Sequence, residues 1–104
     1  MKAQWKYVEK DGNPKEPGIY WVTLIYPAWV NNQCNGKYYA EVCSRYFADL
    51  DKSPELKGWI MDNEPETGMA WTEECGSVKG ERVYAWMPME TIEIADLPAG
   101  VEKI

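Results

Sequence analysis

The carboxylates in the second half of the chain are the side chains whose types and spacing come closest to a recognisable chemistry. Asp62 and Glu73 stand at the first and twelfth positions of a calcium-loop spacing. Glu64 and Glu66 supply further carboxylates between them. The glycine that such a loop needs at its sixth position is displaced to Gly68, a proline interrupts the segment, and no helices are expected beside it. We therefore interpret the segment as a solvated acidic loop, and the sequence predicts no metal and no cofactor.

Pairs of carboxylates raise glycoside hydrolysis as a second possibility. That reaction needs two carboxyl groups held about 5 to 10 Å apart across a sugar, and Glu73 with Glu74 or Glu41 would supply them. Any acidic domain offers such pairs, and no cleft can be deduced from the sequence. The chain contains no histidine, which excludes Ser-His-Asp and Cys-His catalysis. The sequence therefore predicts a protein that is not an enzyme and has no catalytic residue.

The three cysteines show no pattern that predicts a bond or a metal. Cys34, Cys43 and Cys75 are odd in number and lack a Cys-x-x-Cys spacing, which argues against a disulfide framework and against a zinc site. No base can be placed beside Cys43, so we interpret these residues as idle thiols.

Aromatic side chains give the stronger functional signal. The chain has 6 Trp and 7 Tyr against a single Phe, and exposed flat rings suit a sugar, a proline-rich peptide or a protein interface. Three tryptophans are assigned to the core, namely Trp5, Trp21 and Trp86. Two others lie beside polar loops, and with one tyrosine they form the predicted partner-binding patch, which consists of Trp29, Tyr39 and Trp71.

Net charge narrows the range of partners. The chain carries −6 at pH 7, and residues 61–104 hold three Lys and Arg against ten Asp and Glu. An acidic surface repels phosphate, which argues against direct nucleic-acid binding. No apolar run approaches the ~20 residues of a membrane span, and the N-terminus lacks the apolar core of a signal peptide. We expect a cytoplasmic protein without membrane contact.

The longest run of strand-forming residues covers 18–27, and we take it as the central strand. Side chains alternate across a strand, so Ile19 and Trp21 lie in one row while Tyr20 and Val22 lie in the other. Both rows are almost wholly apolar. Such a strand needs cover on two sides, and the sequence leaves open which row stays exposed.

Shorter segments complete the first half of the predicted sheet. Residues 4–9 predict an edge strand with Trp5 and Tyr7 facing inward. A polar loop over 31–36 predicts a hairpin, with residues 37–47 as the returning strand. The inward row of that strand is expected to contain Tyr38, Ala40, Val42 and Tyr46, and its solvent-facing row Lys37, Tyr39, Glu41, Cys43 and Arg45.

The second half of the chain is less regular. Residues 53–58 predict one helical turn, and residues 58–62 predict a short strand. The acidic connection 63–79 is the longest, and long loops are often functional. A last strand over 80–89 must end, or lie at an edge, at Pro88 because proline has no N–H to donate.

Together these segments predict a mainly β protein. We expect a single small twisted antiparallel sheet, or a partly open barrel, of about five strands with one short helical turn. Residues 1–97 are expected to form one globular domain, and residues 98–104 a frayed C-terminal tail.

The two ends of the predicted domain resemble a known family. Three features carry the likeness: an opening strand with Trp5, a Pro-Gly turn at 17–18 before an apolar strand, and a closing stretch over 83–89 that contains Trp-Met-Pro. In these features the chain resembles a small phage- and prophage-associated family, domain of unknown function 551. The likeness covers the two ends of residues 5–89. That family has no assigned activity, so the resemblance implies a phage or mobile-element context and no catalytic residue.

Three functional hypotheses follow from the sequence. The leading one is a non-enzymatic accessory or binding module that contacts a protein partner, or a copy of itself, through the aromatic patch. The first alternative is an acidic decoy, which presents the carboxylates of residues 62–81 and the tail to a nucleic-acid-binding protein in place of phosphates. The second alternative is a small carbohydrate-binding or carbohydrate-active protein.

Overall fold

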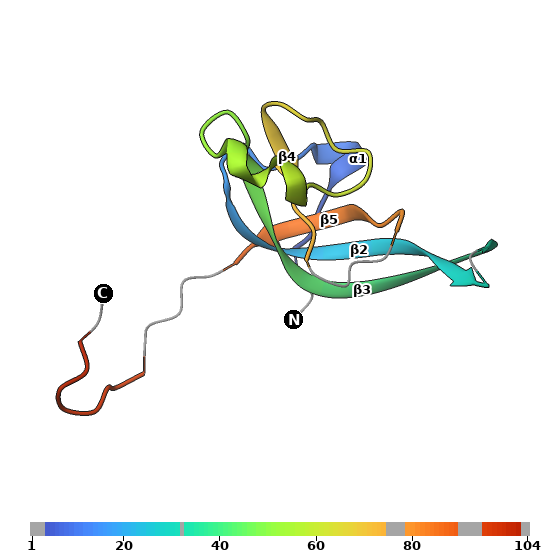
Figure 1. The fold of residues 1–104 in the computed structure, drawn as a ribbon. Coiled ribbons are helices and arrows are strands. Elements are labelled where there is room, and N and C mark those ends of the chain that lie inside the picture. The colour runs from blue at the N-terminus through green and yellow to red at the C-terminus, as the bar shows by residue number, and fades with distance from the viewer. Residues whose placement is uncertain (1–3, 32, 75–78, 90–94, 103–104) are drawn as a thin grey trace.

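The computed structural model describes residues 4–31, 33–74, 79–89 and 95–102. Five antiparallel strands form one open sheet in the order β1-β5-β2-β3-β4 (Figure 1). The strands are β1 (Lys6–Tyr7), β2 (Gly18–Val30), β3 (Gln33–Asp49), β4 (Met69–Trp71) and β5 (Arg82–Pro88). Two short helices accompany them, α1 (Val8–Asp11) and the 3-10 helix η1 (Pro54–Trp59). The predicted mainly β class is confirmed.

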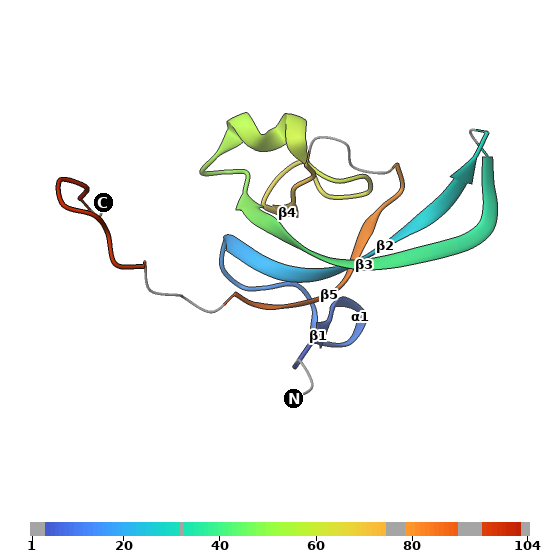
Figure 2. The ribbon, with the colours of Figure 1, turned by 90° about the horizontal axis from the view of Figure 1, so that it is seen from below.

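The β2–β3 hairpin is the largest element of the fold. The two strands pair from Gly18 opposite Phe47 to Val30 opposite Gln33, with a register shift near Pro27. Figure 2 shows the hairpin curving across the body and reaching past it at one end. We call this end, residues 26–40, the hairpin arm. The predicted loop over 31–36 is therefore too long, because only residues 31–32 separate the two strands. Gly36 belongs to β3, where it adopts a φ of 81° at the irregular part of the strand.

The core lies against one face of β2, which we call the inner face. Val22 and Leu24 are fully buried there, whereas Ile19 and Trp21 on the alternate row are exposed. Figure 1 shows η1 and the connection from η1 to β4 together on one side of the sheet, where they cover the inner face. The core cluster consists of Val22, Leu24, Phe47, Met61, Trp71, Val83 and Trp86. Trp86 thus lies in the core as predicted, but the core assignment of Trp21 is wrong.

The two rows of β3 are the reverse of the prediction. Phe47 is buried and Cys43 packs against the core, so the row predicted to face solvent is the inner one. Arg45 belongs to this row and is also buried. The row predicted to face inward contains Val42 and Tyr46, which are exposed. The inner row tolerates a charge because Arg45 forms an ion pair with the buried Glu81, a contact that the strand's own sequence does not reveal.

Several smaller elements also differ from their predictions. The strand predicted over 4–9 shortens to the two residues of β1, which pair with β5 at the sheet edge, and α1 follows directly. Tyr7 is exposed and packs edge-on against Tyr84 rather than facing inward, and Trp5 is only half-buried. The strand predicted over 58–62 is a single bridge between Ile60 and Thr72.

Other predictions for the second half are confirmed. The helical turn forms as η1 with a proline at its start, and β5 ends at Pro88. The predicted connection 63–79 differs from the prediction, because it contains the short strand β4. Residues 95–102, which include most of the tail predicted over 98–104, are exposed. Within the described part of the chain, no helix is long and apolar enough to cross a membrane.

Candidate functional site

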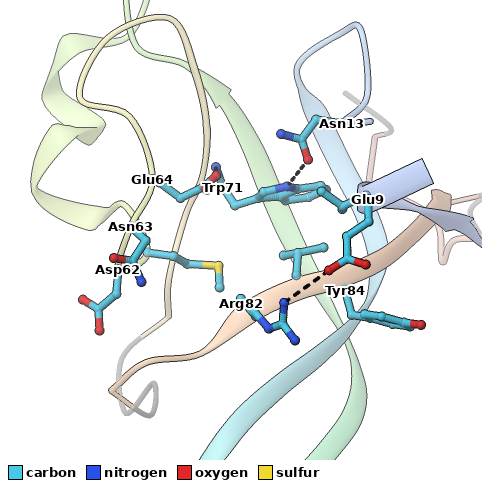
Figure 3. Close-up of a pocket in the computed structure, with 11 residues that line it drawn as sticks. Glu9, Asn13, Asp62, Asn63, Glu64, Trp71, Arg82 and Tyr84 are labelled. Atoms are coloured by element: carbon cyan, nitrogen blue, oxygen red, sulfur yellow. Dashed lines mark hydrogen bonds and ion pairs between the residues drawn. The ribbon is translucent and has the colours of Figure 1, made fainter. Parts of the chain in front are cut away.

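A cavity of about 230 Å³ lies between α1, β5 and the connection after η1 (Figure 3). Its floor is apolar and includes Val8, Met61, Trp71 and Val83. Its rim is polar and includes Glu9, Asn13, Asp62, Asn63, Glu64, Arg82 and Tyr84. The cavity is smaller than the ~300 to 1,000 Å³ typical of small-molecule sites, so it suits a small group rather than a whole cofactor.

Trp71 lines the floor of this cavity, and hydrogen bonds hold both its indole ring and its backbone. Its indole Nε1 donates to Asn13 Oδ1 at 3.0 Å, and its backbone N–H donates to Glu64 Oε1 at 2.7 Å. Burial raises the pKa of Glu64, and the hydrogen bond from the Trp71 N–H opposes that shift. Glu64 therefore fixes the backbone of β4, which is a structural role rather than that of a free acid.

The other charged groups at the rim are also engaged by the chain. Asp62 Oδ2 accepts from the backbone N–H of Gly80 at 2.8 Å. Glu9 and Arg82 form an ion pair of 3.8 Å at the exposed mouth. Among the residues that the structure describes, no group of three or more His, Cys, Asp or Glu side chains is placed to hold a metal ion. The described carboxylates Asp62 and Glu9 at the rim are thus held by contacts within the chain.

A wider depression of about 520 Å³ lies where the loop after α1 meets Tyr20 and Trp86. The Tyr20 hydroxyl donates to the carbonyl of Glu16, and the Trp86 indole donates to the carbonyl of Gly12, both at 2.8 Å. Burial, with a smaller effect of the Glu16 charge, raises the pKa of Tyr20. The two aromatic donors are thus used to attach the loop to the core.

Arg45 is the centre of a buried polar cluster beneath the sheet. Its Nη2 lies 3.6 Å from Glu81, which is also buried, and its Nη1 lies 3.5 Å from the exposed Glu74. Nη1 also donates to Cys43 Sγ at 3.3 Å. Burial raises the pKa of the Cys43 thiol, an effect that the Arg45 charge opposes. A raised pKa disfavours the thiolate, so Cys43 is a poor nucleophile; the side chain of Cys34 and all of Cys75 lie outside the described residues.

The structure separates the three residues of the predicted partner-binding patch. Trp71 is only 2% exposed and packs against Phe47 at 4.7 Å between ring centroids, so its ring is unavailable to a partner. Trp29 lies on the hairpin arm, where its Nε1 donates to the carbonyl of Lys79 at 2.8 Å. Tyr39 is exposed on the arm and contacts Tyr26. Trp71 was misplaced because it lies beside a polar loop in the sequence, while its contacts come from residues distant in the chain.

A larger apolar surface lies on the side of the sheet opposite the core. Cross-strand partners share a face, and the β2–β3 register places Ile19 opposite Tyr46 and Thr23 opposite Val42. The large side chains of this surface are between 38% and 63% exposed. We define the outer face by these five residues: Ile19, Trp21, Tyr38, Val42 and Tyr46. The remaining β2 and β3 residues of the same rows, between positions 19 and 25 and between 38 and 46, carry no charge.

One feature of the sequence already indicates an exposed apolar row, without showing which row it is. Both rows of the central strand are apolar, and a chain of 104 residues has little material to cover both. No family model, curated protein or solved structure matches the chain. Its function must therefore be inferred from these surfaces alone.

Proposed function

We propose that the chain is a non-enzymatic binding module that holds a protein partner against its outer face. The observation that carries this proposal is the exposure of five large apolar side chains on neighbouring rows of β2 and β3 that carry no charge. Soluble proteins seldom leave a contiguous apolar patch of this kind without a partner. Aromatic residues among aliphatic ones, with charges absent from the centre, are typical of protein interfaces.

The structure favours this protein interface over the two alternative hypotheses, a carbohydrate ligand and an acidic decoy. Ile19 and Val42 offer no hydrogen bonds to sugar hydroxyls, and the rows between them hold no carboxylate or amide. The decoy alternative needs carboxylates at the surface, but Glu81 is buried against Arg45 and Glu64 is bonded to β4. Direct binding of nucleic acid is disfavoured as well, because the overall charge of −6 repels a phosphate backbone.

The setting of this module is part of the same proposal. The resemblance at the two ends of the domain supports a phage or mobile-element accessory role, and a cytoplasmic location is proposed with it. Gene neighbourhood tests the setting, because a position inside a phage operon supports it and repeated occurrence among unrelated housekeeping genes contradicts it.

Substitutions on the two sides of the molecule test the binding surface. Trp21→Lys and Ile19→Lys place a charge on the outer face, whereas Trp59→Lys alters a tryptophan on η1 that is more exposed than Trp21. We expect a partner captured from cell extract by the unaltered chain and by Trp59→Lys to be lost from both outer-face variants. Circular dichroism checks that each variant is folded. If all four chains capture the same proteins in the same amounts, the outer face is not the binding surface.

A further inference from the structure

One edge of β3 is open along much of its length. β4 pairs with β3 only from Phe47 to Asp49, and the Thr72 N–H adds one bond to the Tyr46 carbonyl. Among the residues that the structure describes, no strand pairs with residues 38–44 on the side away from β2. An open edge presents unpaired backbone donors and acceptors, and it is a template for another strand.

The hydrogen bond to Tyr46 identifies which backbone groups point outward. Thr72 donates to the Tyr46 carbonyl at 3.0 Å, so the backbone polar groups of Tyr46 face the β4 side. Alternate residues of a strand direct their N–H and C=O groups to the same side. The β2–β3 register is continuous from 38 to 47, so Ser44, Val42, Ala40 and Tyr38 also direct their groups to the open edge. The Ser44 carbonyl already accepts a hydrogen bond from Arg45 Nη1 at 3.1 Å, so the stretch open to pairing is 38–42.

The hairpin arm has a second reason to need a neighbour. β5 pairs with β2 only as far as Ile25, so beyond this point the arm consists of two strands. Figure 2 shows the arm reaching past the rest of the sheet. Gly80 packs on Pro27, and Lys79 accepts the Trp29 hydrogen bond, which supports one side of the arm. A two-stranded ribbon is marginally stable in water, and additional strands stabilise it.

We propose that the open edge of β3 pairs antiparallel with the same edge of a second copy of the chain, about a two-fold axis at Ala40. This inference goes beyond the proposed function because it uses the strand edge rather than the outer face. An antiparallel edge is self-complementary under two-fold symmetry, so each copy supplies the donors and acceptors that the other needs. The pairing joins two five-stranded sheets and places their outer faces side by side.

The side chains select this register over its neighbours. With the axis at Ala40, Tyr38 lies opposite Val42 of the second copy, an aromatic and β-branched pair that favours strand association. Moving the axis to Glu41 sets two like charges directly opposite, which is destabilising. Moving it to Val42 sets Tyr38 opposite Tyr46, whose carbonyl is already bonded to Thr72.

Charge also favours contact at this edge. Two copies of a chain with a net charge of −6 repel each other. Residues 38–44 contain Glu41 as their single charged side chain, so the acidic excess lies elsewhere. Added salt screens the repulsion between the two bodies without weakening the backbone bonds. Dimerisation is therefore expected to strengthen as salt rises.

The test is the solution mass of the full chain and of two variants at Ala40. Ala40→Pro removes an outward N–H and leaves the β2–β3 bonds in place, whereas Ala40→Thr keeps the N–H and serves as the matched control. We expect the unaltered chain and Ala40→Thr to show twice the 12.0 kDa chain mass. Ala40→Pro is expected to dimerise at least about tenfold more weakly, since a bond is lost on each side of the axis.

Amide hydrogen exchange on the unaltered chain tests the same contact without any substitution. As concentration rises, the amides of Ala40 and Val42 should become protected, while those of exposed turn residues such as Lys52 should not change. A chain that stays monomeric at all concentrations, or an Ala40→Pro chain that dimerises as tightly as Ala40→Thr, overturns edge pairing. These two results do not test whether the outer face captures a partner. A chain that fails to capture a partner can still form the dimer, so the two proposals can fail separately.

Discussion

The inner and outer faces of the β2–β3 hairpin both carry large apolar side chains, but they differ in burial. Val22 and Leu24 on the inner face are fully buried, whereas Ile19 and Val42 on the outer face are more than half exposed. The difference arises because the connection that carries η1 and β4 lies over the inner face alone (Figure 1). Burial is thus decided by where the connection lies and not by the hydrophobicity of each row.

Charge is distributed between the two faces in an unusual way. The inner face holds Arg45, with Glu81 as its buried partner, while the β2 and β3 rows of the outer face hold no charge. A surface exposed only to water would gain solubility from charged residues. The binding proposal explains why the exposed rows carry no charge. Four predictions test the difference between the inner and outer faces.

The largest effect is expected from truncating the core ring of the inner face. Phe47→Ala removes a buried ring that packs against Trp71 at 4.7 Å, and it should lower the free energy of unfolding by about 3 to 5 kcal/mol. Urea denaturation measures this change. A loss below 1 kcal/mol would mean that the inner face is not the core.

The second prediction concerns the buried ion pair of the inner face. Glu81→Ala leaves the Arg45 guanidinium buried without its closest enclosed partner and should cost about 3 kcal/mol. The matched control is Glu74→Ala, since Glu74 is largely exposed and its ion pair with Arg45 should contribute less than about 1 kcal/mol. Equal losses in the two variants would contradict the buried position of Glu81.

The third prediction concerns Glu64 at the rim of the cavity. Glu64→Ala leaves the Trp71 backbone N–H without its acceptor and should cost about 1 to 3 kcal/mol. Glu64→Gln keeps an oxygen at that position and removes the charge, so it should stabilise the fold at pH 7. Thermal unfolding of the two variants separates the hydrogen bond from the charge.

The pH dependence of the Glu64→Gln effect follows from the raised pKa of Glu64. The folded state holds the proton more tightly than the unfolded state, so stability of the unaltered chain falls as pH rises from the ordinary value of 4.5 through the raised value. Glu64→Gln lacks this loss, and its advantage should therefore disappear as pH falls below 4.5. An advantage that persists at low pH would mean that charge burial is not its cause.

The smallest effect is expected on the outer face. Val42→Thr exchanges a methyl group for a hydroxyl at an exposed position, and the free energy of unfolding should change by less than about 0.5 kcal/mol. Urea denaturation at a concentration where the chain is monomeric makes this measurement. A loss of 2 kcal/mol or more would show that the outer face is packed within the single chain.

The class of fold and its main hairpin were predictable because they depend on local patterns. The apolar run over 18–27, the proline before η1 and Pro88 at the end of β5 each act on their own segment. The tight two-residue connection was missed because the Asn-Gly pair at 35–36 is the stronger turn signal and lies inside β3.

The choice of face and the position of Trp71 were not predictable from local patterns. The Trp71 ring packs against Phe47 and Tyr20, and its indole N–H donates to Asn13. All three partners are far from Trp71 in the sequence. The three residues of β4 pair with the end of β3 across an irregular connection. Contacts of this range are set by the whole chain, so a polar neighbourhood in sequence does not predict an exposed side chain.

Oxidative footprinting of the unaltered chain, alone and in cell extract, tests the central claim most directly. The chain is exposed to hydroxyl radicals, recovered and examined residue by residue by mass spectrometry. If the outer face holds a partner, oxidation of Trp21 and Tyr46 should fall severalfold in extract, while oxidation of the exposed Trp59 should not change. Equal oxidation of Trp21 and Tyr46 with and without extract, or equal protection of Trp59, would contradict a binding role for the outer face.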